Sequence, residues 1–303
     1  MRERFGGCIV GALLLMTQSC SVNAPSSTAR NSMTVTTRVP AWLAGVWSRE
    51  WIERAGARTS SFEVHYLQTP SAFADFRIPR ERAALAHSKS FADLTGRELL
   101  LLARQRGFAG TTTVAGDLAT WHHEIDFQPP DSSPDIGRLE RVTDLHMLEH
   151  ALDSSYVESW RSVGSGDGRF LALRIEREGR LERALVIVGD QFLYVRNRSR
   201  DLPPAESLDS LIVATRATRE QIIGYLDCEF SMGLVGRGSA AWEIQRSTLP
   251  WREGRPLELV DELALTGAGS LTLLAPASRG VVFSVPINTF SKSELEGMFV
   301  RRQ

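Results

Sequence analysis

The first half of the chain alternates between apolar and polar residues, which is the pattern of β-strands that bury one face. Residues 45–53, 62–68 and 72–78 all show this alternation over the length of an ordinary strand. Pro79 ends the third segment, because proline cannot donate a hydrogen bond to a neighbouring strand. Together the three segments predict an antiparallel meander.

Later segments predict further strands and two helices. Apolar residues at helical spacing predict helices over residues 93–105 and 207–221, the second with Ser207 as its N-cap. The other apolar alternations predict strands, and those after residue 150 form a second series. The expected strands are 108–114, 119–128 and 137–142, then 155–163, 168–176, 184–198, 224–235 and 239–246, with further strands within 257–290.

The two series repeat several features in the same order. Trp121 and Trp242 are each followed closely by an acidic residue and an isoleucine, and Trp51 and Trp160 each come shortly after a glutamate. One helix is expected inside each series. These echoes favour a tandem duplication, although two unrelated all-β domains would also align loosely.

The pattern therefore predicts an all-β fold with minor helices, built as two tandem lipocalin-like antiparallel β-barrels with one helix in each. A glycine, one residue and then a tryptophan just ahead of a strand, as at Gly45 and Trp47, is typical of the start of such a barrel. We expect the first barrel in residues 39–150 and the second in residues 151–303.

Composition narrows the class of protein without identifying it. The chain has 303 residues, 43% of them hydrophobic and 23% charged, which is typical of globular proteins with real cores. The formal net charge is -1, and no basic stripe interleaved with aromatic residues suggests nucleic acid as a partner.

Residues 1–38 have the layout of a secretory signal followed by a tether. Two arginines precede an uncharged apolar stretch at residues 5–16, and Cys20 follows a small residue, as in a bacterial lipobox. Residues 21–32 are rich in Ser, Ala, Pro and Asn, which suits a flexible tether. These features predict an exported lipoprotein that meets the membrane only through a lipid on Cys20. Translation from Met33 would instead give a cytoplasmic protein.

The sequence lacks the motifs of common enzymes. It has no nucleophile elbow, phosphate-binding loop, dinucleotide-binding glycines or His-Glu-x-x-His motif, so we predict a non-enzymatic protein without a cofactor or metal. If Cys8 leaves with the signal and Cys20 carries the lipid, Cys228 remains alone. We expect it to be a buried structural thiol.

Residues 121–127 are the main polar cluster. By alternation Trp121 and His123 face the barrel interior with Ile125 and Phe127, whereas His122, Glu124 and Asp126 face outward. The outward set leaves a metal site open as an alternative to a solvated face. His123 leaves two further alternatives open. It could bind haem, or it could act as the base of an isomerase or cyclase, a role for which Glu50 is a second candidate.

The expected inward residues suggest a ligand site in the first barrel. An arginine among aromatic side chains inside a barrel needs a carboxylate or an anionic ligand, because an unpaired buried charge is costly. Arg49 or Arg77 would hold the anionic group while tryptophans pack on its apolar part. In the alternative, Arg49 pairs with Glu63 or Asp75 and the barrel is filled. The candidate ligand-binding residues are Trp47, Arg49, Trp51, Tyr66, Gln68, Arg77, Trp121 and His123.

The order of motifs resembles that of the fungal casein-kinase-interacting proteins, whose biochemical role is unassigned. The motifs are the strand with Arg49–Trp51, residues 67–77, residues 107–111, the strand of Trp121 and its two histidines, residues 156–161 and residues 188–190. The resemblance covers roughly residues 42–198. It implies two lipocalin-like barrels and supplies no catalytic residues.

Two functions follow as hypotheses. The first is a non-enzymatic binding protein for a small hydrophobic or amphipathic ligand, anionic if an arginine holds it, in a barrel lumen. The second is a protein-interaction module with filled barrels and no ligand.

Overall fold

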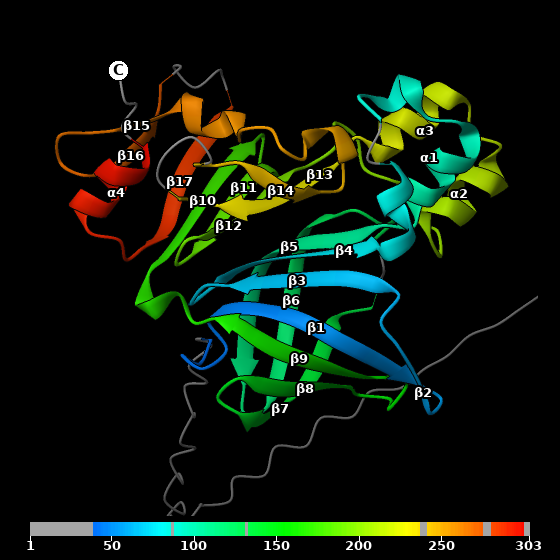
Figure 1. The fold of residues 1–303 in the computed structure, drawn as a ribbon, viewed down its shortest axis with the longest axis horizontal. Helices are drawn as coiled ribbons and strands as arrows, with labels where there is room; N and C mark the ends of the chain where they lie inside the picture. Colours follow the sequence, from blue (N-terminus) through cyan, green and yellow to red (C-terminus); the bar gives the residue numbers. More distant parts are fainter. Residues whose placement is uncertain (1–38, 86–87, 131–132, 237–240, 275–279, 300–303) are drawn as a thin grey trace, which may run out of the picture. The chain divides into compact units, whose positions relative to one another are not determined.

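A closed antiparallel β-barrel of eight strands forms the first part of the fold (Figure 1). The computed structural model describes residues 39–85, 88–130, 133–236, 241–274 and 280–299. The expected signal, Cys20 and the alternative start at Met33 lie outside these residues. The barrel strands are β1 (Gly45–Arg54), β3 (Phe62–Gln68), β4 (Ala72–Pro79), β5 (Arg106–Ala115), β6 (Leu118–Asp126), β7 (Asp135–Thr143), β8 (His146–Ala151) and β9 (Val157–Gly164), with the short β2 (Ala57–Thr59) beside β1.

The strand that closes the barrel is β9, which pairs with β8 on one side and with β1 on the other. The predicted repeat had assigned this segment to the start of a second barrel, and that assignment was wrong. Alternation fixes which face of a strand is buried, but it does not say which strand lies next to it. Trp51 and Trp160, whose similar sequence surroundings suggested a repeat, thus lie on two strands that pair within one barrel.

The second half forms an open sheet, and the prediction of a second barrel is not confirmed. Within the described residues its edge strands, β14 and β17, do not pair with each other. The sheet runs in the order β14 (Ile244–Ser247), β13 (Glu229–Leu234), β12 (Gln191–Arg196), β11 (Arg180–Val188), β10 (Phe170–Arg177) and β17 (Val281–Asn288).

The central strands of this sheet are buried on both faces. One face, with Val186 and Val195, packs on the outside of the barrel and on the helices. The other face, with Leu185 and Ile187, packs under the C-terminal elements. Because both faces are covered, the strands read as continuous apolar runs, and the sheet is a middle layer that encloses no lumen.

Three of the four helices in the described residues gather at one end of the second sheet (Figure 1), and the predicted arrangement of one helix in each of two barrels is not confirmed. The predicted helix at 93–105 is α1 (Gly96–Ala103), which packs on α2 (Leu208–Thr215) and α3 (Arg219–Leu226). The predicted helix at 207–221 begins with Ser207 as its N-cap, as expected, but it divides where Arg216 adopts a left-handed conformation. The remaining elements are α4 (Lys292–Phe299), the hairpin β15 (Leu263–Leu265) and β16 (Leu271–Leu273), and the 3-10 segments Arg80–Leu85, Phe91–Asp93, Gly166–Gly168, Pro250–Arg252 and Glu258–Glu262.

Register shifts interrupt the pairing of the barrel strands at four points, and two of these β-bulges displace predicted site residues. In β1 the register against β9 shifts between Arg49 and Trp51, and in β6 the register against β5 shifts where Gly110 meets His123. Each bulge adds one residue to one strand, so every later side chain changes face. The bulges therefore decide which predicted site residues point into the barrel.

Gly110 permits the bulge in β6. A Cβ atom at this position would lie 2.0 Å from the carbonyl oxygen of His122, which is backbone and cannot move aside cheaply. We expect Gly110→Ala to lower the free energy of unfolding by about 1–3 kcal/mol, the usual effect of overpacking. Urea unfolding measures this effect. Gly96→Ala is the control, because nothing lies within 4 Å of a Cβ atom there, and equal stability of both variants would contradict the role of Gly110.

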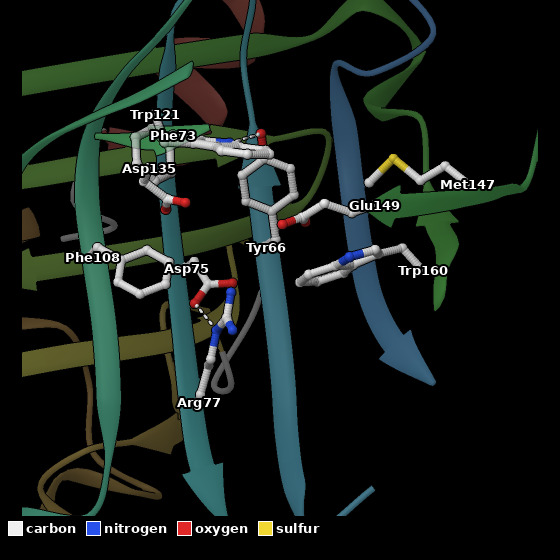
Figure 2. A pocket seen from close by; sticks show the side chains of 10 residues that line it. All are labelled: Tyr66, Phe73, Asp75, Arg77, Phe108, Trp121, Asp135, Met147, Glu149 and Trp160. Carbon is white, nitrogen blue, oxygen red and sulfur yellow. Dashed lines mark hydrogen bonds and ion pairs between the residues drawn. The ribbon is translucent and has the colours of Figure 1, made fainter. Parts of the chain in front are cut away.

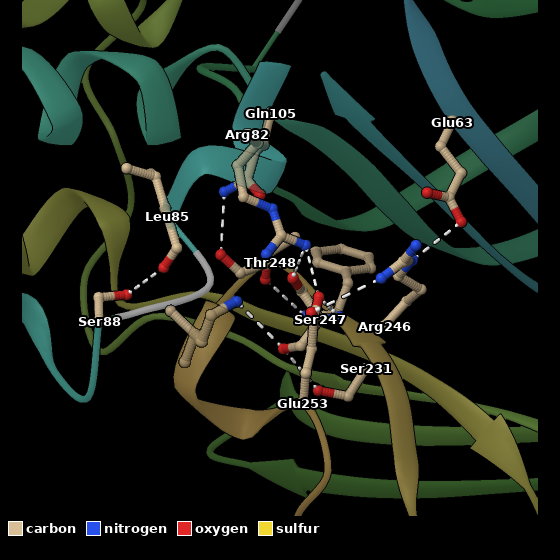
Figure 3. Close-up of polar contacts among 12 residues, drawn as sticks. Glu63, Arg82, Leu85, Ser88, Gln105, Ser231, Arg246, Ser247, Thr248 and Glu253 are labelled. Carbon is tan, nitrogen blue, oxygen red and sulfur yellow. Dashed lines mark hydrogen bonds and ion pairs between the residues drawn. The ribbon is translucent and has the colours of Figure 1, made fainter. Parts of the chain in front are cut away.

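A polar junction joins the barrel to the second sheet (Figure 3). The buried Arg82 donates through Nη2 to the carbonyl oxygen of Ser247 at 2.8 Å and to Glu253 at 2.6 Å. Arg246 reaches Glu63 on the outer face of β3 at 3.1 Å. The junction is thus packed and hydrogen-bonded, and the two sheets form one compact unit.

Candidate binding site in the barrel

The inner face of the barrel carries most of the residues predicted to line it. Because β3 and β4 are regular, their alternation correctly gives the inward positions, including Asp75 beside Arg77. The predicted residues that lie inside or at the rim are Trp47, Arg49, Tyr66, Gln68, Arg77, Trp121 and His123.

A chain of hydrogen bonds holds the side chains of Trp121, Tyr66 and Gln68 in place. Trp121 donates through Nε1 to the hydroxyl of Tyr66 at 3.1 Å, and that hydroxyl donates to Oε1 of Gln68. Thr112 donates to the same Gln68 oxygen at 2.8 Å, while the Gln68 amide donates to the backbone carbonyl of Thr69 at 2.6 Å. Burial raises the pKa of Tyr66, so its hydroxyl stays protonated. These polar groups therefore form hydrogen bonds with one another inside the barrel.

A network of buried charges occupies the middle of the barrel. Arg49 donates to Oε1 of Glu158, and Arg77 donates to the same oxygen at 3.3 Å. Arg77 also binds Asp75 at 3.0 Å, as Figure 2 shows. Burial lowers the pKa of Arg77, but the carboxylates of Asp75 and Glu158 outweigh it and raise the pKa overall. Two guanidinium groups and two carboxylates thus balance each other inside the barrel.

Glu158 is the central residue that the sequence interpretation missed. The filled-barrel alternative had paired Arg49 with Glu63 or Asp75, but Glu63 faces outward and Asp75 binds Arg77. The signal was present as the alternation Tyr156-x-Glu158-x-Trp160, an inward carboxylate on an aromatic strand. The predicted repeat places this strand in the second barrel, away from Arg49, whereas in the structure it pairs with β1.

The lumen holds little free volume. A cavity of about 20 Å³ lies between the aromatic side chains and the charged network. A cavity needs roughly 10–15 Å³ to hold one water molecule, so this space suits a single water. Two buried polar atoms, Oε2 of Glu158 and Nε1 of Trp160, have no hydrogen-bond partner among the described residues. A drug-sized ligand would need several hundred Å³, on the order of 300 Å³ or more.

Glu149 is a second buried carboxyl beside this cavity. Figure 2 shows it projecting toward Tyr66 and Trp160, and the hydroxyl of Tyr156 donates to its Oε1 at 3.0 Å. Burial, helped by the nearby Glu158, raises the pKa of Glu149 to about 8. Glu149 is therefore neutral at pH 7 and leaves the charge balance of the network unchanged.

His123 is held between two carboxylates. Its Nδ1 lies 2.7 Å from Asp126 and its Nε2 lies 3.0 Å from Asp135, and its ring stacks on Phe108 at 4.6 Å. Burial lowers the pKa of His123, but the two hydrogen bonds outweigh it and raise the pKa to about 9. The stabilisation is therefore complete below about pH 6.5 and is lost as the pH rises through about 9. With both nitrogens engaged, His123 has none free to bind haem iron.

The bulges move several predicted residues away from the lumen. Trp51 lies on the face opposite Ile52 and Arg54, where the guanidinium of Arg58 covers its ring at 3.9 Å. Its predicted inward position was wrong because the bulge shifts the phase of the alternation. Glu50, a candidate base, accepts hydrogen bonds from Ser159 and Arg161.

The bulge in β6 also separates the residues of the hypothetical metal site. His122 contacts Thr113, Glu124 binds Arg174 of the second sheet, and Asp126 turns inward to His123. Ile125 and Phe127, expected inside, pack in the core outside the barrel. Over the described part of the chain, no cluster of three or more His, Cys, Asp or Glu side chains has metal-binding geometry. Cys228 is buried, as expected.

One end of the barrel opens into an arginine-lined hollow of about 120 Å³, which we call the mouth. It is formed where β1, β3, β4 and β5 end or begin on the same side of the barrel. Its walls comprise Arg49, Ile52, Arg54, Thr59, Ser61, Phe62, Arg77 and Arg106.

The arginines at the mouth differ in their partners. Arg49 and Arg77 bind Glu158, whereas Arg54 has a ring contact with Tyr156 at 5.5 Å. Among the described residues the exposed side chain of Arg106 has no hydrogen bond or ion pair, and Arg106 lies directly opposite Arg77 in the pairing of β4 with β5. Burial lowers the pKa of Arg106, and the positive charges of Arg77 and Arg54 lower it further. Like charges directly opposite across strands are destabilising, so the mouth carries excess positive charge.

Comparison of the chain with models of known protein families, with curated proteins and with solved structures gives no match. The resemblance to the fungal casein-kinase-interacting proteins therefore stays a prediction. The described residues include no helix of the length and apolarity needed to cross a bilayer. Export and lipidation at Cys20 also stay predictions.

Proposed function

We propose that the barrel is a non-enzymatic binding module for a small amphipathic anion, a carboxylate or a phosphate monoester. The observation that carries this proposal is the mouth, where four arginines face a hollow of about 120 Å³ and two of them have no carboxylate partner in the described part of the chain. A bound anion would offset the repulsion between Arg77 and Arg106 through charge-assisted hydrogen bonds. We assign the ligand to the mouth because the lumen has space for about one water.

The mouth also offers contacts for the rest of such a ligand. The hydroxyls of Thr59 and Ser61 add hydrogen-bonding groups to one wall, and Ile52 and Phe62 add apolar surface. A short apolar chain next to the anionic group can pack against these two side chains. We therefore expect hexanoate to bind more tightly than acetate, since each buried methylene contributes about 0.8 kcal/mol.

Isothermal titration calorimetry at low salt tests the proposal with acetate, hexanoate and inorganic phosphate as probes. We expect Arg106→Gln and Arg54→Gln each to weaken binding by about 10- to 100-fold, the usual contribution of a hydrogen bond to a charged group. Arg104→Gln is the matched control, because Arg104 is exposed, binds Glu81 and lies away from the mouth.

Unchanged affinity in Arg106→Gln would refute the assignment of the ligand to the mouth. The lack of binding by all three probes would favour the alternative, a protein-interaction module, since a filled lumen is also what that alternative expects. Native mass spectrometry of protein from its source would then look for a stoichiometric protein partner.

A further inference from the structure

A second hollow of about 510 Å³ lies on the second sheet, on the face away from the barrel. Strands β11, β12 and β13 form its floor, and the 3-10 segments Phe91–Asp93, Pro250–Arg252 and Glu258–Glu262 form its walls. We call this hollow the bowl. Its volume lies within the range of small-molecule sites, about 300–1,000 Å³.

The charges of the bowl are paired with one another. Arg183 donates to both oxygens of Glu262 at 2.9 and 2.8 Å, and Arg252 binds Glu229 at 3.1 Å and Glu258 at 2.8 Å. Arg196 binds Asp227 at 2.7 Å. An ion of either sign would have to compete with these pairs, so the bowl is unlike the arginine-rich mouth of the barrel. It suits a neutral ligand that can both donate and accept hydrogen bonds.

Two donors in the bowl are left without partners. Tyr194 is 5% exposed, and its hydroxyl has no hydrogen-bond partner in the described part of the chain. The Nε of Arg183 is also buried without a partner there. The hydroxyl of Tyr194 faces the bowl, so a ligand oxygen there can accept from it, whereas the enclosed Nε of Arg183 leaves no room for a ligand atom beside it.

Aromatic and apolar side chains complete the bowl. Trp251 and Phe91 contact each other edge to face at 4.6 Å and form part of one wall. Leu249, Leu257 and Leu259 add apolar surface between the ion pairs. A ring that has polar edges and an apolar face fits this combination, since its C–H face packs on aromatic side chains while its hydroxyls meet the paired charges.

From these observations we propose that the bowl is a binding site for a neutral sugar. This site is independent of the anion site in the barrel, because the two hollows share no lining residue. One ring hydroxyl accepts from Tyr194, and others donate to the carboxylates of Glu229 and Glu262.

Saturation-transfer NMR and calorimetry with neutral sugars test the proposal. The probes are glucose, galactose, mannose, maltose and lactose, with glucosamine and glucuronate as charged analogues of glucose. We expect at least one neutral sugar to bind and Tyr194→Phe to weaken that binding by roughly three- to tenfold, the loss of one neutral hydrogen bond. Tyr225→Phe is the control, because Tyr225 does not line the bowl.

Several outcomes would overturn the sugar site. They are binding of none of the neutral sugars, binding of the charged analogues alone, and equal affinity of Tyr194→Phe and the unchanged protein. Arg106→Gln separates the two proposals, because it should weaken hexanoate binding and leave sugar binding unaltered.

Discussion

Glu158→Gln is expected to lower the free energy of unfolding by about 3–5 kcal/mol, the usual effect of removing one partner from a buried ion pair. The reason is the shared oxygen of Glu158, which accepts hydrogen bonds from both Arg49 and Arg77. The variant keeps the shape of the side chain but leaves Arg49 buried beside a neutral amide. Urea unfolding of the purified protein measures the difference.

Two further variants make this prediction specific. Glu53→Gln alters the exposed pair with Arg58 and should change stability by less than about 1 kcal/mol. Arg49→Met combined with Glu158→Gln removes the unpaired charge and should be more stable than Glu158→Gln alone. If Glu158→Gln unfolds within about 1 kcal/mol of the unchanged protein, the buried network does not hold the barrel as described.

Glu149→Gln is expected to remove much of the pH dependence of stability at neutral pH. The pKa of Glu149 is raised from 4.5 to about 8 by burial and by Glu158. Between these values the unfolded chain has released the proton while the folded chain keeps it, so stability falls as the pH rises. The slope is at most about 1.4 kcal/mol per pH unit. Glutamine remains neutral in both states and lacks this slope.

Unfolding curves of both proteins at several pH values test this expectation. The variant should match the unchanged protein near pH 5 and exceed its stability by several kcal/mol, about 3–5, near pH 8. His123 also loses stabilisation as the pH rises above about 6.5, so the comparison uses the difference between the two proteins. A difference that stays constant across this range would show that Glu149 is ionised in the folded barrel.

The sequence predicts the inward positions of the regular barrel strands well because successive side chains of a strand point to opposite faces. The alternation correctly gives Trp47, Arg49 and Tyr66 as inward residues. It fails at Trp51 and at Ile125, each of which follows a bulge. A bulge is an extra residue relative to the partner strand, so it is visible only once the pairing is known. Gly110 is a signal for one bulge, but a glycine inside a strand has several possible causes.

The pairing of distant segments was the harder part of the prediction. The predicted repeat places the strand with Glu158 in a second barrel because Trp160, like Trp51, follows a glutamate, whereas in the structure the two strands pair with each other. A clearer signal lay in residues 184–188 and 192–195, whose continuous apolar character indicates burial on both faces. The sequence predicts only two of the four arginines at the mouth, Arg49 and Arg77. Arg54 and Arg106 join them because β1, β4 and β5 end or begin on the same side of the folded barrel.

The most direct test of the anion site is a crystal structure of the protein soaked in selenate, an oxyanion that can be located by its anomalous scattering. The proposal predicts an anomalous peak between Arg49, Arg54, Arg77 and Arg106, within hydrogen-bond distance of Arg106. A map with selenate at exposed arginines such as Arg104 and none at the mouth would contradict the proposal.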